Sequence, residues 1–167
     1  MARHVVVVDS DLGFNQILEE IKKTGRQEIL VGIQEGSRTH VQVRRSRKQE
    51  AGINIAQYAA ENEFGTNKIP ARSFMRSTFD ERINEINEII DDELGLVIDR
   101  VQTLNKAFAR IGLSIQGMIQ QKIREIRSPP NSRATIAIKG SSKPLIDFGQ
   151  MIASVRYVVR RIRSNNP

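Results

Sequence analysis

A long helical pattern in the second half of the chain limits the possible folds more than any other feature. Apolar residues recur there at alternating spacings of three and four, which is the periodicity of a coiled coil. The series comprises Ile83, Ile86, Ile90, Leu94, Val97, Val101, Leu104, Phe108, Ile111, Ile115 and Met118. Roughly five heptads at about 1.5 Å per residue would span on the order of 50 Å, too long for one rigid helix in a small domain.

Glycines within this pattern indicate where it folds back. Gly95, Gly112 and Gly117 each disfavour a helix interior by about 1 kcal/mol relative to alanine. We therefore expect residues 74–127 to form a long protruding helix or, with a break near Gly95, a helical hairpin. The Ser-Pro-Pro sequence at 128–130 ends the helical region.

The flanking segments predict a small sheet. Val5–Val8 is typical of a buried strand, and residues 28–33 of a second one. A turn then leads into a third strand at 41–44, so these two should form a hairpin. A final strand is expected at 155–162. The result would be an α+β fold over residues 1–167, with a mostly antiparallel sheet flanked by helices and the long helical segment inserted between its strands.

Three shorter helices are expected beside the sheet. They cover residues 12–24, 51–64 and 148–154. Gly65 and Pro70 separate the second of these from the long helical segment, which should begin near Arg72 or Ser73. Residues 135–139 are expected to form a strand or an extended loop.

The composition argues against several classes of function. The chain has no cysteine, which removes disulfides, thiolate zinc sites and cysteine nucleophiles and fits a reducing cytoplasm. Only His4 and His40 could serve as imidazole bases. The Asp91-Asp92-Glu93 run shares its face with no histidine and is typical of a solvated acidic surface. With no apolar run of bilayer length, we expect a soluble protein without enzymatic activity, metal or cofactor.

Charge is segregated along the chain, whose formal net charge is +7. Acidic residues dominate 80–99, whereas basic residues dominate 38–48, 122–133 and 156–163. Three interpretations remain open: ordinary surface charge, head-to-tail docking of identical subunits that closes a ring, or a basic face that contacts DNA. The candidate basic patch consists of Arg44, Arg45, Arg47, Lys48, Arg160 and Arg161.

Three segments carry a resemblance to a known family. They are Val31-Gly32-Ile33, the motif from Ala56 to Arg76 with its Glu-Phe-Gly-Thr and Ile-Pro-Ala-Arg elements, and the stretch from Thr135 to Val155. In order and spacing they resemble the tail-completion and virion-morphogenesis proteins of tailed bacteriophages, which include the lambda minor tail protein Z-like, Mu protein G-like and HK97 gp10-like groups. Ser73 departs from the pattern, since relatives commonly carry a second proline there.

The resemblance implies roles for particular residues at subunit or partner interfaces. Those in the middle motif are Glu63, Phe64 and Gly65, which would fix a turn, Pro70 and Arg72, which would anchor the connection, and Phe74 and Met75, which would pack against the sheet or a neighbour. Those in the last motif are Pro144, Leu145, Asp147 and Gly149, which would cap a C-terminal helix. An equally weighted interpretation is that all of them only maintain the fold of the subunit.

The function implied by the resemblance is structural. The chain would complete the tail and join it to the DNA-filled head, as one subunit of a six-membered ring in the neck of the virion. Its partners would be tail tube or terminator proteins, head connector proteins and the packaged DNA, with assembly in the host cytoplasm. The alternative is a basic nucleic-acid-binding protein, which would bind free duplex DNA with a steep dependence on salt.

Overall fold

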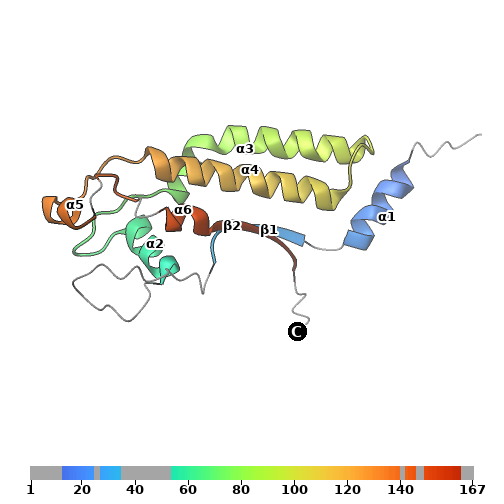
Figure 1. Ribbon diagram of the computed structural model, residues 1–167. Coiled ribbons are helices and arrows are strands. Elements are labelled where there is room, and N and C mark those ends of the chain that lie inside the picture. Colours follow the sequence, from blue (N-terminus) through green and yellow to red (C-terminus); the bar gives the residue numbers. More distant parts are fainter. Residues whose placement is uncertain (1–12, 25–26, 35–53, 140–141, 146–148, 163–167) are drawn as a thin grey trace, which may run out of the picture.

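The computed structural model describes residues 13–24, 27–34, 54–139, 142–145 and 149–162 (Figure 1). The elements follow the order α1 (Phe14–Thr24), β1 (Gln27–Ile33), α2 (Ile55–Phe64), α3 (Met75–Ile98), α4 (Leu104–Glu125), α5 (Arg133–Lys139), α6 (Gln150–Ser154) and β2 (Val155–Arg161). Helices dominate, and β1 pairs with β2 in a small antiparallel sheet. The predicted α+β class is confirmed.

The long heptad pattern forms a helical hairpin of α3 and α4. Cross-helix ion pairs between Glu81 and Lys122 (2.6 Å) and between Glu93 and Arg110 (2.6 Å) show that the two helices run antiparallel. The break lies after Gly95, which remains helical, in the turn between Ile98 and Leu104. There the Thr103 side chain accepts a hydrogen bond from the Lys106 amide, so an N-cap rather than a glycine sets the position of the turn.

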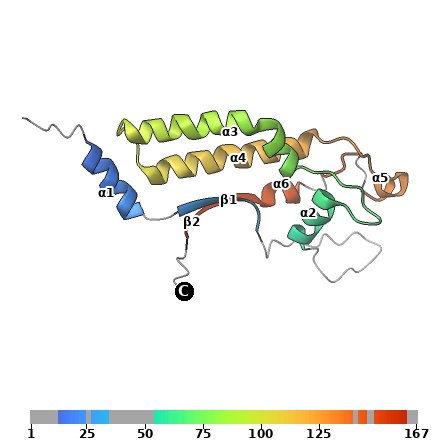
Figure 2. The ribbon, with the colours of Figure 1, turned by 180° about the vertical axis from the view of Figure 1, so that it is seen from behind.

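Three layers make up the body of the molecule, with α4 between α3 and the sheet (Figures 1 and 2). One side of α4 packs against α3 through the apolar heptad residues, and its other side covers one face of the sheet. The buried core comprises Ile55, Ala59, Phe74, Ile86, Ile111, Ile115, Met118, Ile119, Ile123, Leu145, Met151 and Val155. Because both sides of α4 are covered, this helix contributes more buried residues than any other described element.

The register of the sheet separates a covered face from an open one. The pairing runs from Gln27 opposite Arg161 to Ile33 opposite Val155. Ile29, Val31 and Ile33 pack against the core, whereas Leu30 and its partner Val158 remain exposed on the opposite face. Figures 1 and 2 show none of the drawn helices on that face.

Several predicted boundaries agree with the structure. Helix α1, strand β1, the end of α2 at Phe64 and strand β2 lie where the sequence placed them. Helix α6 begins at Gln150, two residues later than expected, after Gly149 with φ of +70°. The strands predicted at 5–8 and 41–44 lie outside the described residues.

Three predictions of local structure are wrong. Helix α2 starts at Ile55 rather than at Ala51, because the Asn54 side chain accepts from the amides of residues 56 and 57. Helix α3 starts at Met75, later than expected, since a carboxylate binds its first amides. Residues 135–139 are helical, because the Ser132 hydroxyl accepts from the Thr135 amide and thereby caps α5 despite the β-branched side chains.

We predict that two glycines of α4 respond oppositely to alanine. A Cβ at Gly112 would lie 2.6 Å from Tyr157 Cδ2, whereas nothing lies within 4 Å of one at Gly117. Gly112→Ala should therefore lower the free energy of unfolding by about 1–3 kcal/mol through overpacking. Gly117→Ala should raise it by up to about 1 kcal/mol through helix propensity. Urea denaturation measures both changes, and equal effects would contradict this packing of α4 on β2.

Candidate functional site

The middle motif builds a buried junction between α2 and α3, around the carboxylate of Glu63. Its Oε2 accepts hydrogen bonds from the amides of Phe74 (2.7 Å) and Met75 (2.9 Å). Its Oε1 accepts from the Arg76 amide (3.0 Å) and from the Ser73 hydroxyl (2.7 Å). The three amides are backbone donors that the start of a helix leaves without intrahelical partners. A negative charge at this position also complements the helix dipole. The end of α2 thus caps the beginning of α3.

The ionisation of Glu63 reflects these contacts. The residue is only 4% exposed. Burial alone would raise the pKa of its carboxyl group, but hydrogen bonds from the amides of residues 74–76 and from Ser73 outweigh burial and lower the pKa. The Ser73 hydroxyl is therefore one of the donors that stabilise the carboxylate, and a proline at this position would have no donor to offer.

The turn after Glu63 depends on a glycine. Gly65 has a φ of +79°, and a Cβ there would lie 2.9 Å from the backbone nitrogen of Ala71. The loop is closed by a hydrogen bond from the Thr66 amide to the Ile69 carbonyl, and Pro70 is exposed next to it. The Gly-Thr and Ile-Pro elements of the motif therefore form one tight connection whose backbone shape excludes other residues at position 65.

A second buried side chain, Arg72, anchors this connection to a distant part of the chain. Its Nε donates to the Pro129 carbonyl (2.7 Å) and its Nη2 to the Pro130 carbonyl (3.1 Å). Its Nη1 donates to Asn62 Oδ1 (3.1 Å), so the guanidinium joins α2 to the segment after α4. Burial lowers the pKa of Arg72, yet an arginine keeps its charge in proteins. Its planar set of donors matches these acceptors.

The junction also presents an exposed pair of side chains. Phe64 is 67% exposed, and the guanidinium carbon of Arg76 lies 5.0 Å from the centre of its ring. Two contacts with Glu63 fix the Arg76 side chain. Its Nε donates to Glu63 Oε1 (3.2 Å), and its Nη2 donates to the Glu63 carbonyl (3.0 Å). The aromatic ring and the cation therefore have a fixed relation to the buried carboxylate.

Other residues of the predicted site contribute to the subunit interior. Phe74 and Leu145 are almost completely buried, Pro144 is buried, and Met75 is half-buried against the core. Gly149 lies at the start of α6. Among the described residues of the predicted interface, Phe64 and Pro70 are exposed, whereas Gly65, Met75 and Gly149 are partly accessible. Asp147 lies outside the described residues.

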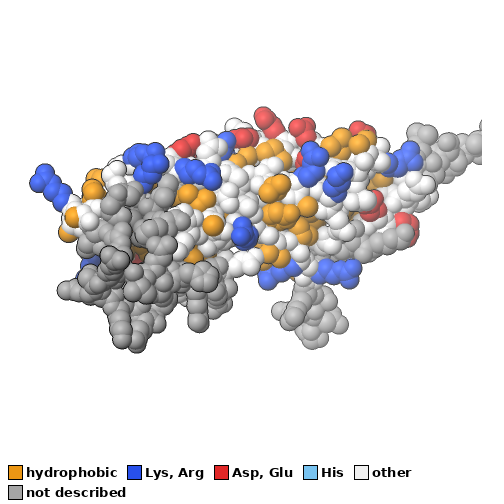
Figure 3. Space-filling view, viewed as in Figure 1, with side chains coloured by type: hydrophobic (Ala, Val, Ile, Leu, Met, Phe, Trp, Pro, Cys, Tyr) orange, Lys and Arg blue, Asp and Glu red, His pale blue; other side chains and the backbone are white. Residues whose placement is uncertain are grey.

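The predicted basic patch is only partly within the described structure. Arg160 and Arg161 are exposed on β2, and Arg160 Nε lies 2.7 Å from Glu28 Oε1 on the paired strand. Arg44, Arg45, Arg47 and Lys48 lie outside the described residues. Figure 3 shows Lys and Arg side chains below the sheet and Asp and Glu side chains along α3 at the top. Other Lys and Arg side chains lie across the upper part of the molecule in the same view, and Lys122 of α4 pairs with Glu81 of α3, so the charges are not separated into layers.

Glu93 has a structural role that its sequence context did not predict. It is buried, accepts from Gln102 Nε2 (2.7 Å) and pairs with Arg110 Nε (2.6 Å) across the hairpin. The hydrogen bond from Gln102 and the charge of Arg110 lower the pKa of this carboxyl group, although burial opposes them. The interpretation of this residue as part of a solvated acidic face is therefore wrong. Its spacing of seven from buried Ile86 could have identified it.

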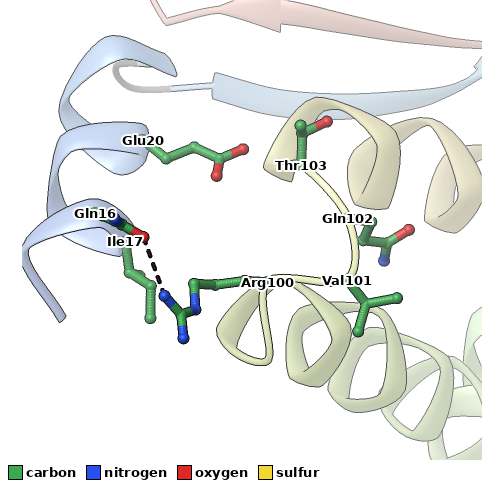
Figure 4. A pocket seen from close by; sticks show the side chains of 7 residues that line it. All are labelled: Gln16, Ile17, Glu20, Arg100, Val101, Gln102 and Thr103. Carbon is green, nitrogen blue, oxygen red and sulfur yellow. Dashed lines mark hydrogen bonds between the residues drawn. The ribbon is translucent and has the colours of Figure 1, made fainter. Parts of the chain in front are cut away.

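A small hollow lies at the tip of the hairpin. It has a volume of about 290 Å³ and is lined by Gln16, Ile17, Glu20, Arg100, Val101, Gln102 and Thr103 (Figure 4). Arg100 Nη1 donates to Gln16 Oε1 (3.1 Å), and the Leu104 amide donates to Glu20 Oε1 (2.8 Å). These contacts attach α1 to the hairpin tip.

No family model, curated protein or solved structure matches this chain. Within the ranges that the structure describes, no helix combines the length and apolarity needed to cross a bilayer. Those ranges also contain no group of three or more His, Cys, Asp or Glu side chains placed to hold a metal ion. The junction around Glu63 and Arg72 is therefore interpreted from its own contacts and not from those of a related protein.

We predict that Glu63→Gln lowers the free energy of unfolding by about 3 kcal/mol at neutral pH. The amide would bring its own donors toward N–H groups that now bind a carboxylate, and such charged hydrogen bonds contribute about 1.5–3 kcal/mol each. Glu61→Gln is the matched control, because within the described part of the chain the Glu61 carboxylate accepts a hydrogen bond only from the surface side chain of Gln57. Urea denaturation should show a change within about 0.5 kcal/mol for this control.

The same pair of variants tests the ionisation of Glu63. Because its folded pKa is lowered, the carboxylate stabilises the fold fully above the unfolded pKa of about 4.3. This contribution is lost as the pH falls through the lower, folded pKa. The difference in stability between wild type and Glu63→Gln should therefore narrow in acid. A difference that does not change with pH would contradict the capping role.

Proposed function

We propose that this chain is a structural protein of a tailed bacteriophage or prophage that completes the tail and joins it to the head. It acts without catalysis, as one subunit of a ring of six in the neck of the virion, and is assembled in the host cytoplasm. Its partners are copies of itself, tail tube or terminator proteins and head connector proteins. The ring surrounds the path of the packaged DNA.

The observation that carries the proposal is the convergence of the three segments that resemble the family. Ile33, from the first segment, pairs with Val155, from the last. Helix α2, from the middle segment, packs against both α6 and β1. The segments are far apart in sequence, yet they form one end of the molecule (Figure 1). A chance likeness of separate short motifs would not require such a common location.

The exposed surface of the junction supports an assembly role. Phe64 and Arg76 combine a phenylalanine with an arginine, two residue types that are enriched in the buried core of protein–protein interfaces. Glu63 holds Arg76 in place, so little ordering is needed on binding. We therefore assign this pair to the contact with a neighbouring virion protein.

Nucleic-acid binding remains the second candidate, because Arg156, Arg160 and Arg161 are exposed on β2. This second candidate function requires the purified protein to bind free duplex DNA, with an affinity that falls steeply as the salt concentration rises. The structural proposal requires little affinity outside the particle. Fluorescence anisotropy with a labelled duplex at low and moderate salt separates the two.

The direct test is deletion of the coding sequence from the phage genome that carries it, followed by electron microscopy of the lysate. We expect filled heads beside unattached or abnormally long tails, with wild-type chain supplied in trans restoring joined particles. Phe64→Asp should fail to restore them, whereas Leu113→Asp, at an exposed apolar position on α4, should succeed. Normal infectious particles from the deletion would overturn the proposed function.

A further inference from the structure

Arg100, at the tip of the hairpin, occupies a backbone position that normally suits glycine. Helix α3 ends in a Schellman motif, in which the Val101 amide donates to the Leu96 carbonyl (2.9 Å) and the Arg100 amide donates to the Val97 carbonyl (3.0 Å). Arg100 has a φ of +62°, and among the described residues other than glycine it alone has a positive φ. A side chain at this position of the motif is strained. Such an outlier indicates that the arginine side chain has a role that glycine could not fill.

The Arg100 side chain binds the beginning of helix α1. Its Nη1 donates to Gln16 Oε1 (3.1 Å). A Cβ on Gly13 would lie 2.6 Å from Nη1 and 2.8 Å from the guanidinium carbon, so a larger residue at position 13 would displace the guanidinium. One turn further along α1, Glu20 Oε1 accepts from the Leu104 amide (2.8 Å) at the first residue of α4 (Figure 4). Both sides of the hairpin turn therefore bind α1, one through Arg100 and the other through Leu104.

Apolar packing contributes little to this attachment. None of the side chains at positions 14–22 is buried, and the buried core of the described structure includes no residue of α1. The hollow of about 290 Å³ lies between α1 and the hairpin tip. An isolated helix of 11 residues is only marginally stable, so the order of α1 depends on its docking. A segment with few buried apolar contacts opens at a lower free energy than the whole domain.

We propose that α1 undocks from the hairpin tip as a unit while the three-layer body stays folded, and that Arg100 sets the equilibrium between the docked and undocked states. In the docked state the contacts of the guanidinium with Gln16 and Gly13 offset the backbone strain at Arg100. In the undocked state the strain remains and these contacts are lost. Undocking exposes the half-buried Ile17 and the first amides of α4. The equilibrium involves this chain alone and goes beyond the proposed virion role, so either can fail without the other.

The variant Arg100→Gly separates the docking of α1 from the stability of the body. Glycine suits the backbone at this position, so the urea midpoint should stay constant or rise. The contact with α1 is lost, however, so native-state hydrogen exchange should show at least tenfold lower protection of the Leu18, Glu19 and Ile21 amides. Protection of the Ile119 amide in α4 should not fall. Unchanged protection of the α1 amides, or an equal loss at Ile119, would overturn the role of Arg100.

The wild-type chain tests whether α1 moves as a unit. The same three α1 amides should share one opening free energy, which is lower than that of Ile119 and insensitive to low concentrations of urea. A gradient of protection along α1 would indicate fraying and would overturn the proposal. Exchange of these amides only through global unfolding would also overturn it.

Two adjacent glutamates provide a matched pair of variants. Glu20→Ala removes the contact with the Leu104 amide and should lower the protection of the α1 amides at least tenfold. Glu19→Ala removes only an exposed pair with Lys22 (3.4 Å) on the same helix and should change protection by no more than about twofold. Equal effects of the two substitutions would contradict docking of α1 through the hairpin tip.

Discussion

The buried carboxylate of Glu63 is the contact on which the rest of the structure depends. The first amides of α3 lie at the edge of the core, where unpaired donors are costly, and this single side chain satisfies those of residues 74–76. By fixing the start of α3 relative to α2, it also fixes the hairpin that α3 forms with α4. Since α4 covers the sheet, the position of every layer follows from this cap.

Arg72 complements the cap with the opposite charge and a different kind of partner. Glu63 binds amides, whereas Arg72 binds the carbonyl groups of Pro129 and Pro130. The two side chains therefore tie both ends of the hairpin to α2, one at the start of α3 and one after the end of α4. The motif from Ala56 to Arg76, which resembles a segment of phage tail-completion proteins, attaches the long hairpin to the small sheet in this structure. Its exposed part, Phe64 with Arg76, is what remains available to a partner.

The sequence predicted those features that arise from periodicity. The heptad spacing predicted the long helical segment over residues 74–127 and left open whether it forms one helix or a hairpin, and the spacing of apolar residues predicted helix α1. The hairpin turn follows Ile98, three residues after Gly95, and the Thr103 cap marks the start of α4. The helix at α5 was missed because the Ser132 cap opposed the β-branched side chains that favour a strand.

The roles within the candidate site were harder to predict. The motif identified Glu63 and Arg72, but the Pro129 carbonyl that Arg72 binds is 57 residues away in sequence. Contacts of this kind depend on the packing of the whole hairpin and have no local signal. The ion pair of Glu93 with Arg110 is similar, since only the heptad register relates a buried carboxylate on α3 to a cation on α4.

Native-state hydrogen exchange at the start of α3 is the sharpest test of the capping role of Glu63. If the Glu63 carboxylate holds this helix start, the amides of Phe74, Met75 and Arg76 will exchange only through global unfolding in the wild-type chain. In Glu63→Gln the same three amides will exchange by local opening, while that of Ile119 in the core of α4 keeps the protection expected from the variant's global stability. Rapid exchange of the three amides in the wild-type chain would contradict this role.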